Sequence, residues 1–416
     1  MAKIKKIRAL EILDSRGNPT VKATVILDNG LSGSASVPSG ASTGKYEALE
    51  LRDNDTRYNG LGVLTACENI NETIAKKIAG FDVLNQKKID ETLIKLDGTE
   101  NKSNLGANAI LAVSLATARA AAKSENVPLY QYLSKTFNFK KLRQIPTALF
   151  NVINGGAHSD SGLSIQEFHI IPREFSAFSE KMRVASEIYH KLKEILANAG
   201  YPVGVGDEGG FAPRLEGNVE AFEYIEKAIK ETGYNFSGTV SMGIDSAANF
   251  FTNKENAYTL KPENISLEAE RLIALYQEWK KKYDLFLIED GLAEDDFENW
   301  KKLNERIGAD TLIIGDDLLV TNINRLKKAL SFQACNAAIV KPNQIGTLTE
   351  TMEFVKHCQK NDIRCIVAHR SGETEDDFIA DLAVAAGAEF VKFGAPCRGE
   401  RTAKYNRLLE IENELK

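Results

Sequence analysis

A repeated pattern in the second half of the chain limits the folds that it can adopt. Six short apolar runs each end in an ionisable residue, at Asp245, Glu289, Asp316, Lys341, His369 and Lys392. From Glu289 onward these residues follow one another at intervals of 23 to 28 positions, while 44 positions separate Asp245 from Glu289. Such an interval accommodates one strand and one helix, and continuously apolar strands are typical of parallel sheets buried on both faces. The pattern therefore predicts six βα units.

Two further strand-like runs precede these units. TALFNVIN (147–154) and LSIQEFHIIP (163–172) are separated by fewer than a dozen residues, too few for a parallel crossover, so we expect them to pair antiparallel. Helices are expected at 177–199 and 219–232. Two strands and the six units make eight, which predicts a closed α/β barrel of ββαα(βα)6 order.

The N-terminal part has the pattern of a separate α+β domain. Residues 4–37 predict three antiparallel strands, and helices are expected at 62–79, 83–96 and 107–124. We expect this domain to cover 1–137 and the barrel to cover 138–416. Between sheet and helices, the small residues of 38–44 have the composition of a mobile lid, although an ordinary connection would look the same.

Composition and charge exclude several classes of protein. The chain has 416 residues, and its formal net charge of −6 provides no basic surface for nucleic acid. Its five cysteines form no CxxC pair, which argues against a disulfide framework or a zinc site. The N-terminal sequence lacks the apolar segment of a signal peptide, and no run is long enough to span a membrane. A cytoplasmic protein is expected.

Three of the six strand-end residues carry carboxylates. In an α/β barrel the carboxyl ends of the strands meet at one mouth, so Asp245, Glu289 and Asp316 are expected to lie close together. Oxygen ligands suit a hard cation such as Mg²⁺ and disfavour zinc. The alternative interpretation is that each acid only caps a helix.

The two strand-end lysines are candidates for proton transfer. Near a bound cation and a second ammonium, the pKa of Lys341 or Lys392 would be lowered, which favours a role as base. A lysine extending its ammonium out to solvent is the alternative. Glu208 lies among glycines that would allow close approach to a ligand, although a glycine-rich turn with solvated acids would look the same, and Glu167 is expected at the end of the second strand. Two carboxylates in one pocket cannot both ionise easily, so one can act as an acid.

A base, a metal site and an acid form the set needed to remove a proton beside a carboxylate and expel a β-hydroxyl. The motifs around these residues resemble those of the enolase family. They are VPSGASTG (37–44), NGGAH (154–158), QEF (166–168), GDEGGFAP (206–213), IED (288–290), GDDL (315–318), KPNQIGT (341–347) and HRSGETED (369–376). The similarity extends from LDSRGNPT (13–20) to AKYNRLLEIE (403–412), which is essentially the whole chain.

The resemblance implies reversible dehydration of 2-phosphoglycerate to phosphoenolpyruvate. It implies Lys341 as the base and Glu208 as the acid, with Glu167 and His158 supporting the acid. Asp245, Glu289 and Asp316 would hold the first of two Mg²⁺ ions, and Ser42 would join the second. The residues that would contact substrate are Ser42, His158, Glu167, Glu289, Asp316, His369, Arg370, Ser371 and Lys392, of which Arg370 and Ser371 would bind its phosphate.

Some positions depart from the family pattern. Asn249, Phe250, Ala368 and Phe393 stand where the family has other residues, and we expect them to change metal affinity and rate rather than the reaction. Lys22 and Glu410 reverse the signs of a charge pair that joins two subunits in the family. Because both signs are reversed, the attraction is kept, and a homodimer is expected, possibly assembled further to an octamer.

Two other functions fit parts of the sequence. An acid-sugar dehydratase or racemase would use the same scaffold, but Arg370, Ser371 and the 38–44 segment indicate a phosphate site that it would not need. Similar enolases also join RNA-degrading assemblies or bind host proteins at the cell surface through a C-terminal lysine, and this chain ends in Lys416. Such binding would be an addition to catalysis, without direct contact to nucleic acid and with a possible surface or secreted pool.

Overall fold

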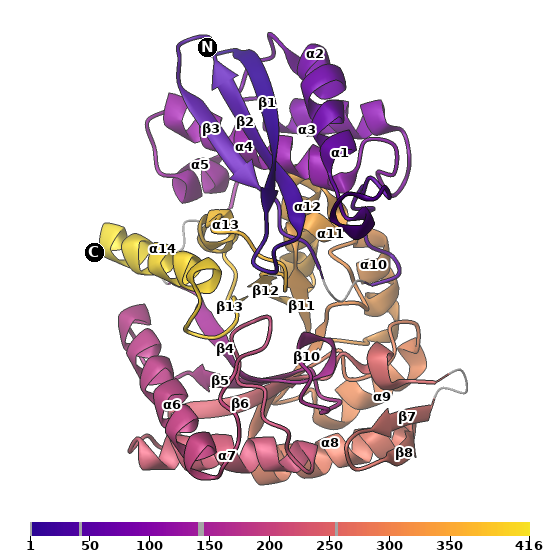
Figure 1. The fold of residues 1–416 in the computed structure, drawn as a ribbon, viewed down its shortest axis with the longest axis vertical. Coiled ribbons are helices and arrows are strands. Elements are labelled where there is room, and N and C mark those ends of the chain that lie inside the picture. Colours follow the sequence, from indigo (N-terminus) through magenta and orange to yellow (C-terminus); the bar gives the residue numbers. More distant parts are fainter. Residues whose placement is uncertain (1, 41–43, 140–144, 254–256) are drawn as a thin grey trace.

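The N-terminal part of the chain is an antiparallel sheet covered by helices. The computed structural model describes residues 2–40, 44–139, 145–253 and 257–416. Its first sheet has the order β1 (Ile4–Leu13), β2 (Pro19–Leu27) and β3 (Ser32–Ser36), as predicted. Helix α4 (Ala107–Ser124) lies against this sheet (Figure 1) and is buried over most of its length. Gly33 allows the close contact, because a Cβ there would lie 2.2 Å from the backbone nitrogen of Ala120.

The other N-terminal helices follow the expected ranges closely. Helix α1 (Leu64–Glu68), the π-helical turn η2 (Asn69–Ile74) and α2 (Ala75–Ile78) form one continuous segment, and α3 (Gln86–Asp97) begins after an Asn85 side-chain cap. The short elements η1 (Arg57–Gly60) and α5 (Leu129–Thr136) were not predicted. Each is only a few turns long at most, too short for a clear apolar periodicity.

Eight strands form the predicted closed barrel. They are β4 (Thr147–Asn154), β5 (Glu167–Pro172), β6 (Val240–Asp245), β9 (Leu285–Glu289), β10 (Leu312–Gly315), β11 (Ala337–Val340), β12 (Arg364–Ala368) and β13 (Phe390–Lys392). Their order around the barrel is β10-β11-β12-β13-β4-β5-β6-β9. Strand β5 runs antiparallel to both neighbours, and the other pairs are parallel. The predicted ββαα(βα)6 order is confirmed.

Helices surround the barrel. They are α6 (Phe178–Asn198), α7 (Asn218–Glu231), α8 (Ala269–Tyr283), α9 (Phe297–Ile307), α10 (Ile323–Phe332), α11 (Pro342–Ile345), α12 (Leu348–Lys360), α13 (Phe378–Ala386) and α14 (Gly399–Leu415), with the short turns η3 (Gly156–His158) and η4 (Ala248–Phe251). A hairpin of β7 (Ala257–Leu260) and β8 (Ile265–Glu268) explains the long interval between Asp245 and Glu289. None of the helices in the described residues is long and apolar enough to cross a membrane.

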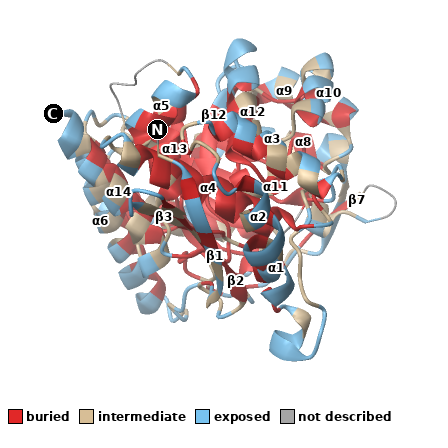
Figure 2. Cartoon of the chain, turned by 90° about the horizontal axis from the view of Figure 1, so that it is seen from above, coloured by how far each residue is buried: buried red, intermediate tan, exposed pale blue. Residues whose placement is uncertain are grey.

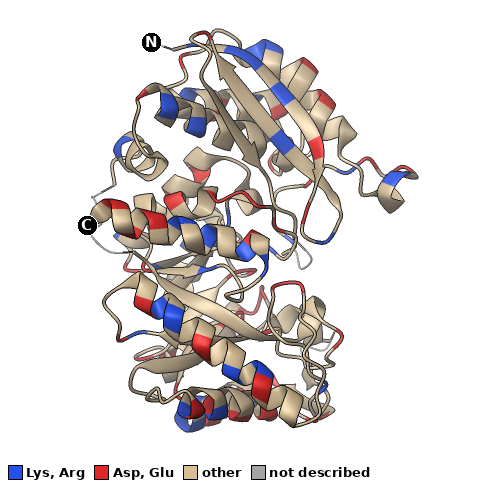
Figure 3. Ribbon diagram, turned by 60° about the vertical axis from the view of Figure 1, so that its left-hand side comes forward, with Lys and Arg blue, Asp and Glu red and all other residues tan. Residues whose placement is uncertain are grey.

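Apolar side chains fill the barrel below its mouth. Leu149, Ile171, Leu287, Ile314, Ile339 and Ile366 form one buried cluster inside it. In Figure 2 the buried residues gather in the middle of the molecule and the exposed ones lie on the outer turns. The outer helices carry charges of both signs, as along the C-terminal helix in Figure 3. Ionisable side chains that are buried are therefore exceptions, and many of them lie at the barrel mouth.

Candidate active site

Five of the predicted residues form a cluster that we call the strand-end cluster: Asp245, Glu289, Asp316, Lys341 and Lys392. The ammonium of Lys392 lies 2.9 Å from Asp245 Oδ2 and 2.8 Å from Glu289 Oε1. It also lies 3.0 Å from Glu167 Oε1. Strands β6, β9 and β13 bring these groups together because each of the three ends at the residue concerned. A single buried cation thus compensates three carboxylates.

Lys341 forms the second ion pair of the strand-end cluster. Its ammonium contacts Asp316 Oδ2, and Asp316 Oδ1 accepts a hydrogen bond from Gln344 Nε2 at 2.9 Å. Thr321 Oγ1 accepts from the Lys341 backbone nitrogen at 2.9 Å and donates to Gln344 Oε1 at 2.8 Å. Thr321 and Gln344 therefore fix both partners of the pair.

The pKa of Lys341 differs from the expectation. Burial lowers this pKa, but neighbouring carboxylates, Asp316 first and then Glu289, together outweigh burial, so that the pKa lies above its ordinary value of 10.5. The expected lowering depended on a cation near the lysine, and the chain's own groups act in the opposite direction. Lys341 is protonated unless another positive charge competes for Asp316.

The oxygen atoms of the strand-end cluster suit a divalent cation. Glu289 Oε2 is buried and lacks a hydrogen-bond partner within the described part of the chain. Burial raises the pKa of Glu289 to about 8, and the charge of Asp245 adds to the rise. Ionising this carboxylate therefore requires more positive charge than Lys392 supplies. Hard oxygen ligands short of positive charge fit Mg²⁺.

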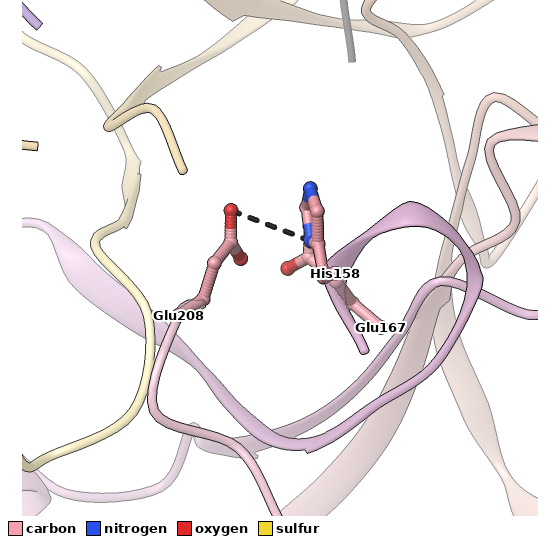
Figure 4. A group of neighbouring side chains, drawn as sticks. All are labelled: His158, Glu167 and Glu208. Carbon is pink, nitrogen blue, oxygen red and sulfur yellow. Dashed lines mark ion pairs between the residues drawn. The ribbon is translucent and has the colours of Figure 1, made fainter. Parts of the chain in front are cut away.

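A second group, which we call the acid cluster, consists of His158, Glu167 and Glu208. Figure 4 shows the three side chains pointing toward one another. His158 Nδ1 lies 3.5 Å from Glu208 Oε1 and 3.9 Å from Glu167 Oε1. On its other side, Glu208 Oε2 lies 3.3 Å from His369 Nε2. These residues come from η3, the start of β5, the 206–210 loop and the end of β12. Glu167 begins its strand, whereas we had expected it at the end; it still lies at the mouth because β5 runs antiparallel to its neighbours.

The loop that carries Glu208 packs tightly on its own chain. A Cβ at Gly206 would lie 2.6 Å from the His158 carbonyl oxygen, and one at Gly210 would lie 2.9 Å from Asn154 Oδ1. The glycines thus allow this packing, whereas we had expected them to allow the approach of a ligand. Close contact with 154–158 fixes Glu208 beside His158.

The proton distribution in the acid cluster is uneven. Burial raises the pKa of Glu167 well above its ordinary value, and the charge of Glu208 adds to the rise. Burial would also raise the pKa of Glu208, but the imidazoles of His158 and His369 outweigh it and hold that pKa well below the ordinary value. Of the two carboxyls, Glu167 is therefore the one that holds a proton more readily, whereas the family resemblance assigned the acid role to Glu208.

Arg370 lies in the wall of a cavity of about 400 Å³ between the N-terminal part and the barrel. Its guanidinium is buried and pairs with Glu47 at 2.8 Å and with Asn343 Oδ1 at 3.1 Å. Ser39 and Gly372 form a β-bridge, with backbone hydrogen bonds of 2.7 and 2.9 Å. This bridge places the start of the 38–44 segment beside Arg370 and Ser371. Ser42 lies outside the described residues.

Comparison with known proteins agrees with this geometry. The model of the enolase N-terminal domain matches residues 4–133, and that of the enolase C-terminal TIM barrel domain matches residues 143–416. The chain belongs to the enolase family. Its activity is accordingly that of a phosphopyruvate hydratase, a hydro-lyase of glycolysis.

Relatives in the enolase family are similar over their full length. The enolase of a Nitratiruptor species is 52% identical over 415 residues, which are 100% of this chain and 97% of the relative. The enolase of Wolinella succinogenes is 49% identical with the same coverage. That of one Helicobacter pylori strain is 48% identical over 417 residues, again 100% of this chain and 97% of the relative.

The departures from the enolase pattern lie around the site rather than in it. Asn249 donates to Asp317 Oδ2 at 3.1 Å and accepts from the Glu294 backbone nitrogen at 2.9 Å. Phe250 is 51% exposed, so it cannot tune a buried site by contact. Ala368 lines the apolar barrel interior, and the Phe393 ring packs against Tyr405. Asn249 thus contacts Asp317, which adjoins Asp316, and Ala368 is the strand partner of Lys392 in the β12–β13 pair.

Several residues of the site were not predicted. Glu47 pairs with Arg370, His169 Nε2 lies 3.0 Å from Glu167 Oε2, and Asn151 Nδ2 donates to Glu208 Oε2 at 3.2 Å. His169 follows Glu167 by two positions, which places both on one face of β5. That spacing could have identified His169 from the sequence. No regular spacing relates Glu47 to Arg370, so Glu47 could not have been identified in this way.

Proposed function

We propose that this site interconverts 2-phosphoglycerate and phosphoenolpyruvate, with Lys341 taking the C2 proton and Glu208 protonating the departing hydroxyl. The observation that carries the proposal is the separation of these two groups across the barrel. Lys341 follows β11, whereas Glu208 lies beside His158 and Glu167 at β4 and β5, which stand about half a turn further round the barrel. A base and an acid on opposite sides of one substrate can act in separate steps.

The strand-end cluster provides the charge that the reaction needs. Asp245, Glu289 and Asp316 would hold one Mg²⁺ and Ser42 would join a second; bound Mg²⁺ supplies positive charge where negative charge develops on the substrate. Lys392 adds a fixed ammonium beside the substrate carboxylate. Any cation that competes with Lys341 for Asp316 lowers the pKa of Lys341, which must be neutral to accept the C2 proton.

The acid cluster handles the second proton. Ionised Glu208 can activate water when phosphoenolpyruvate is hydrated, but it must gain a proton before it protonates the hydroxyl of 2-phosphoglycerate. Glu167 holds a proton, and the His158 imidazole lies between the two carboxyls, 3.5 Å from Glu208 and 3.9 Å from Glu167. We infer that His158 passes this proton, while His369 orients Glu208 from the other side.

The remaining contacts hold the substrate. Arg370, Ser371 and Ser42 would bind the phosphate, and the cavity of about 400 Å³ beside Arg370 supports this assignment. Arg370 pairs with Glu47, so the phosphate would replace this carboxylate as the partner of the guanidinium. The substrate carboxylate and hydroxyl would face the residues of both clusters, namely Glu289, Asp316, Lys392, His158, Glu167 and His369.

The test is a direct assay. Adding 2-phosphoglycerate to the purified protein with Mg²⁺ should produce the ultraviolet absorbance of a conjugated enol phosphate, and chelation of Mg²⁺ should abolish it. An acid sugar without phosphate serves as the matched control substrate. Turnover of the acid sugar, or no Mg²⁺-dependent signal with 2-phosphoglycerate, would refute the proposal.

We further propose a homodimer in the cytoplasm, in which Lys22 of one subunit pairs with Glu410 of the other. In β1, Leu10 is 62% and Leu13 is 55% exposed, and Leu10 pairs with Lys22 across the sheet. Exposed leucines beside this lysine favour a face that a second chain covers. We also propose a domain boundary between 137 and 138, after α5 and before β4.

A further inference from the structure

Arg401 on α14 is completely buried although it is charged. Its NH1 group donates to His369 Nδ1 at 2.8 Å and to the Arg370 carbonyl oxygen at 2.6 Å. Its NH2 group donates to the carbonyl oxygens of Asp207 at 2.9 Å and Ser371 at 2.7 Å. Burial of a charged side chain is costly unless hydrogen bonds satisfy it, and four acceptors satisfy the two terminal nitrogens here, while Nε lies 3.5 Å from Glu400 Oε1 without a hydrogen bond.

The contact with His369 fixes the proton of its imidazole. A guanidinium has donors and no acceptor, so His369 Nδ1 must accept and cannot carry a proton. In the neutral ring the proton is then on Nε2, which faces Glu208 Oε2 at 3.3 Å. Burial lowers the pKa of His369 to about 3, and the charge of Arg401 contributes to the lowering. The ring is therefore neutral, and its one N–H donor lies 3.3 Å from Glu208 Oε2 without being aligned for a hydrogen bond.

The three carbonyl contacts join two loops. Asp207 immediately precedes Glu208, while Arg370 and Ser371 belong to the proposed phosphate loop. The rigid, planar guanidinium of Arg401 binds both loops and so fixes the distance between them, which a flexible lysine could not do. One helical turn further along α14, Lys404 holds Glu373 Oε2 and the Thr374 carbonyl oxygen, both at 2.9 Å, so the same helix face also fixes the end of the phosphate loop.

We propose that Arg401 is a positioning residue for the acid step: it sets the tautomer of His369 and holds the Glu208 loop against the phosphate loop. The inference rests on the proposed function, because it assigns Arg401 to the acid side of that reaction. Among the described residues, the hydrogen bonds and ion pairs of Arg401 reach neither Lys341 nor the strand-end carboxylates. Its loss should therefore affect the two proton transfers unequally.

Kinetics of Arg401→Lys and Arg401→Met test this inequality. At saturating 2-phosphoglycerate we expect at least a tenfold loss of dehydration in both variants, while exchange of the C2 proton with solvent falls less than threefold. KM should also rise, because the phosphate loop loses two anchors. Equal loss of exchange and dehydration, or wild-type kinetics in Arg401→Lys, would overturn the proposal.

Arg407→Gln is the matched control. Arg407 lies on the same helix and pairs with Asp381 at 2.8 Å, but it contacts neither loop in the described structure. This variant removes a comparable arginine ion pair and should leave the ratio of exchange to dehydration unchanged. If it changed the ratio as much as Arg401→Lys, the effect would belong to α14 in general, and the proposal would be wrong.

A second measurement is independent of activity. In wild-type protein labelled with ¹⁵N-histidine, the chain's five histidines give separable ring signals, and His369→Asn assigns the signal of interest. We expect His369 to be the neutral Nε2–H form from pH 6 to 8. A proton on Nδ1 would overturn the proposal even if the protein proved active, whereas the Nε2–H form in an inactive protein would refute only the proposed function.

Discussion

The two halves of the site are held together by different kinds of interaction. In the strand-end cluster, opposite charges meet directly, with the Lys392 ammonium 2.9 Å from Asp245 Oδ2 and 2.8 Å from Glu289 Oε1. In the acid cluster, the contacts of His158 with two carboxyls measure 3.5 and 3.9 Å, and none of the three groups is a permanent cation. The strand-end cluster is therefore held together by ion pairs of its lysines with carboxylates. The acid cluster consists of groups that can exchange protons with one another.

The largest expected effect comes from the strand-end cluster. Lys341→Ala should reduce both dehydration and C2 exchange by about 10⁴-fold, since a positioned base contributes up to that factor and no other group replaces it. Exchange is followed by loss of deuterium from C2-labelled substrate, and dehydration by absorbance. If exchange persisted, the base would have to lie in the acid cluster, and the distinction between the two halves would fail.

Glu208→Gln should have a slightly smaller effect, confined to one step. The amide keeps the shape but cannot donate the proton, so dehydration should fall by about 10²- to 10³-fold while C2 exchange remains within a few-fold of wild type. Both rates are measured as for Lys341→Ala. A parallel loss of exchange would mean that Glu208 supports the base, contrary to its position across the barrel.

Metal binding provides a test that does not depend on turnover. Glu289→Gln removes one charged oxygen ligand, and we expect the Mg²⁺ affinity measured by calorimetry to fall by roughly a hundredfold. Loss of a residue that only hydrogen-bonds to a metal ligand already lowers metal affinity by up to about this factor. Glu298→Gln, an exposed acid on α9, is the control and should bind like wild type. Unchanged affinity in Glu289→Gln would place the metal outside the strand-end cluster.

The smallest expected effect concerns the dimer. Lys22→Glu should raise the dissociation constant about tenfold at low salt, because each dimer has two such pairs and an exposed pair contributes roughly 0 to 1 kcal/mol. Sedimentation at several dilutions measures it. Adding Glu410→Arg should restore association; dissociation of the double variant as readily as the single one would rule out the pairing.

The two halves also differ in how far the sequence predicts them. The strand-end residues could be located from the interval between apolar runs, because the register of a parallel barrel brings the ends of its strands to one mouth. Glu208 and His158 lie on irregular segments, where no periodicity relates one residue to another. The flanking glycines made Glu208 a candidate, and only the family motifs indicated His158. Arg401 could not be found either way, since its role depends on the packing of α14 against loops far away in the chain.

The raised pKa of Lys341 shows a further limit. Its position at the end of β11 was predicted correctly. The sign of its pKa shift depends on the balance between burial and nearby carboxylates, and this balance depends on the distance between Lys341 and Asp316, which the sequence does not give. The β7–β8 hairpin is a milder case: the interval after Asp245 is longer than the others, but no strand was predicted within it. The spacing of residues in the sequence predicts which groups lie close together, and the distances between these groups decide their pKa values.

The position of Arg401 in the last helix has a consequence for biosynthesis. A ribosome makes the N-terminal sheet first and α14 last, and domains tend to fold in the order of their synthesis. The barrel strands and nearly all polar groups of the site are thus present before the residue that joins the Glu208 loop to the phosphate loop emerges. A nascent chain that lacks α14 would hold the catalytic groups without their alignment, so activity should appear only after α14 has been made.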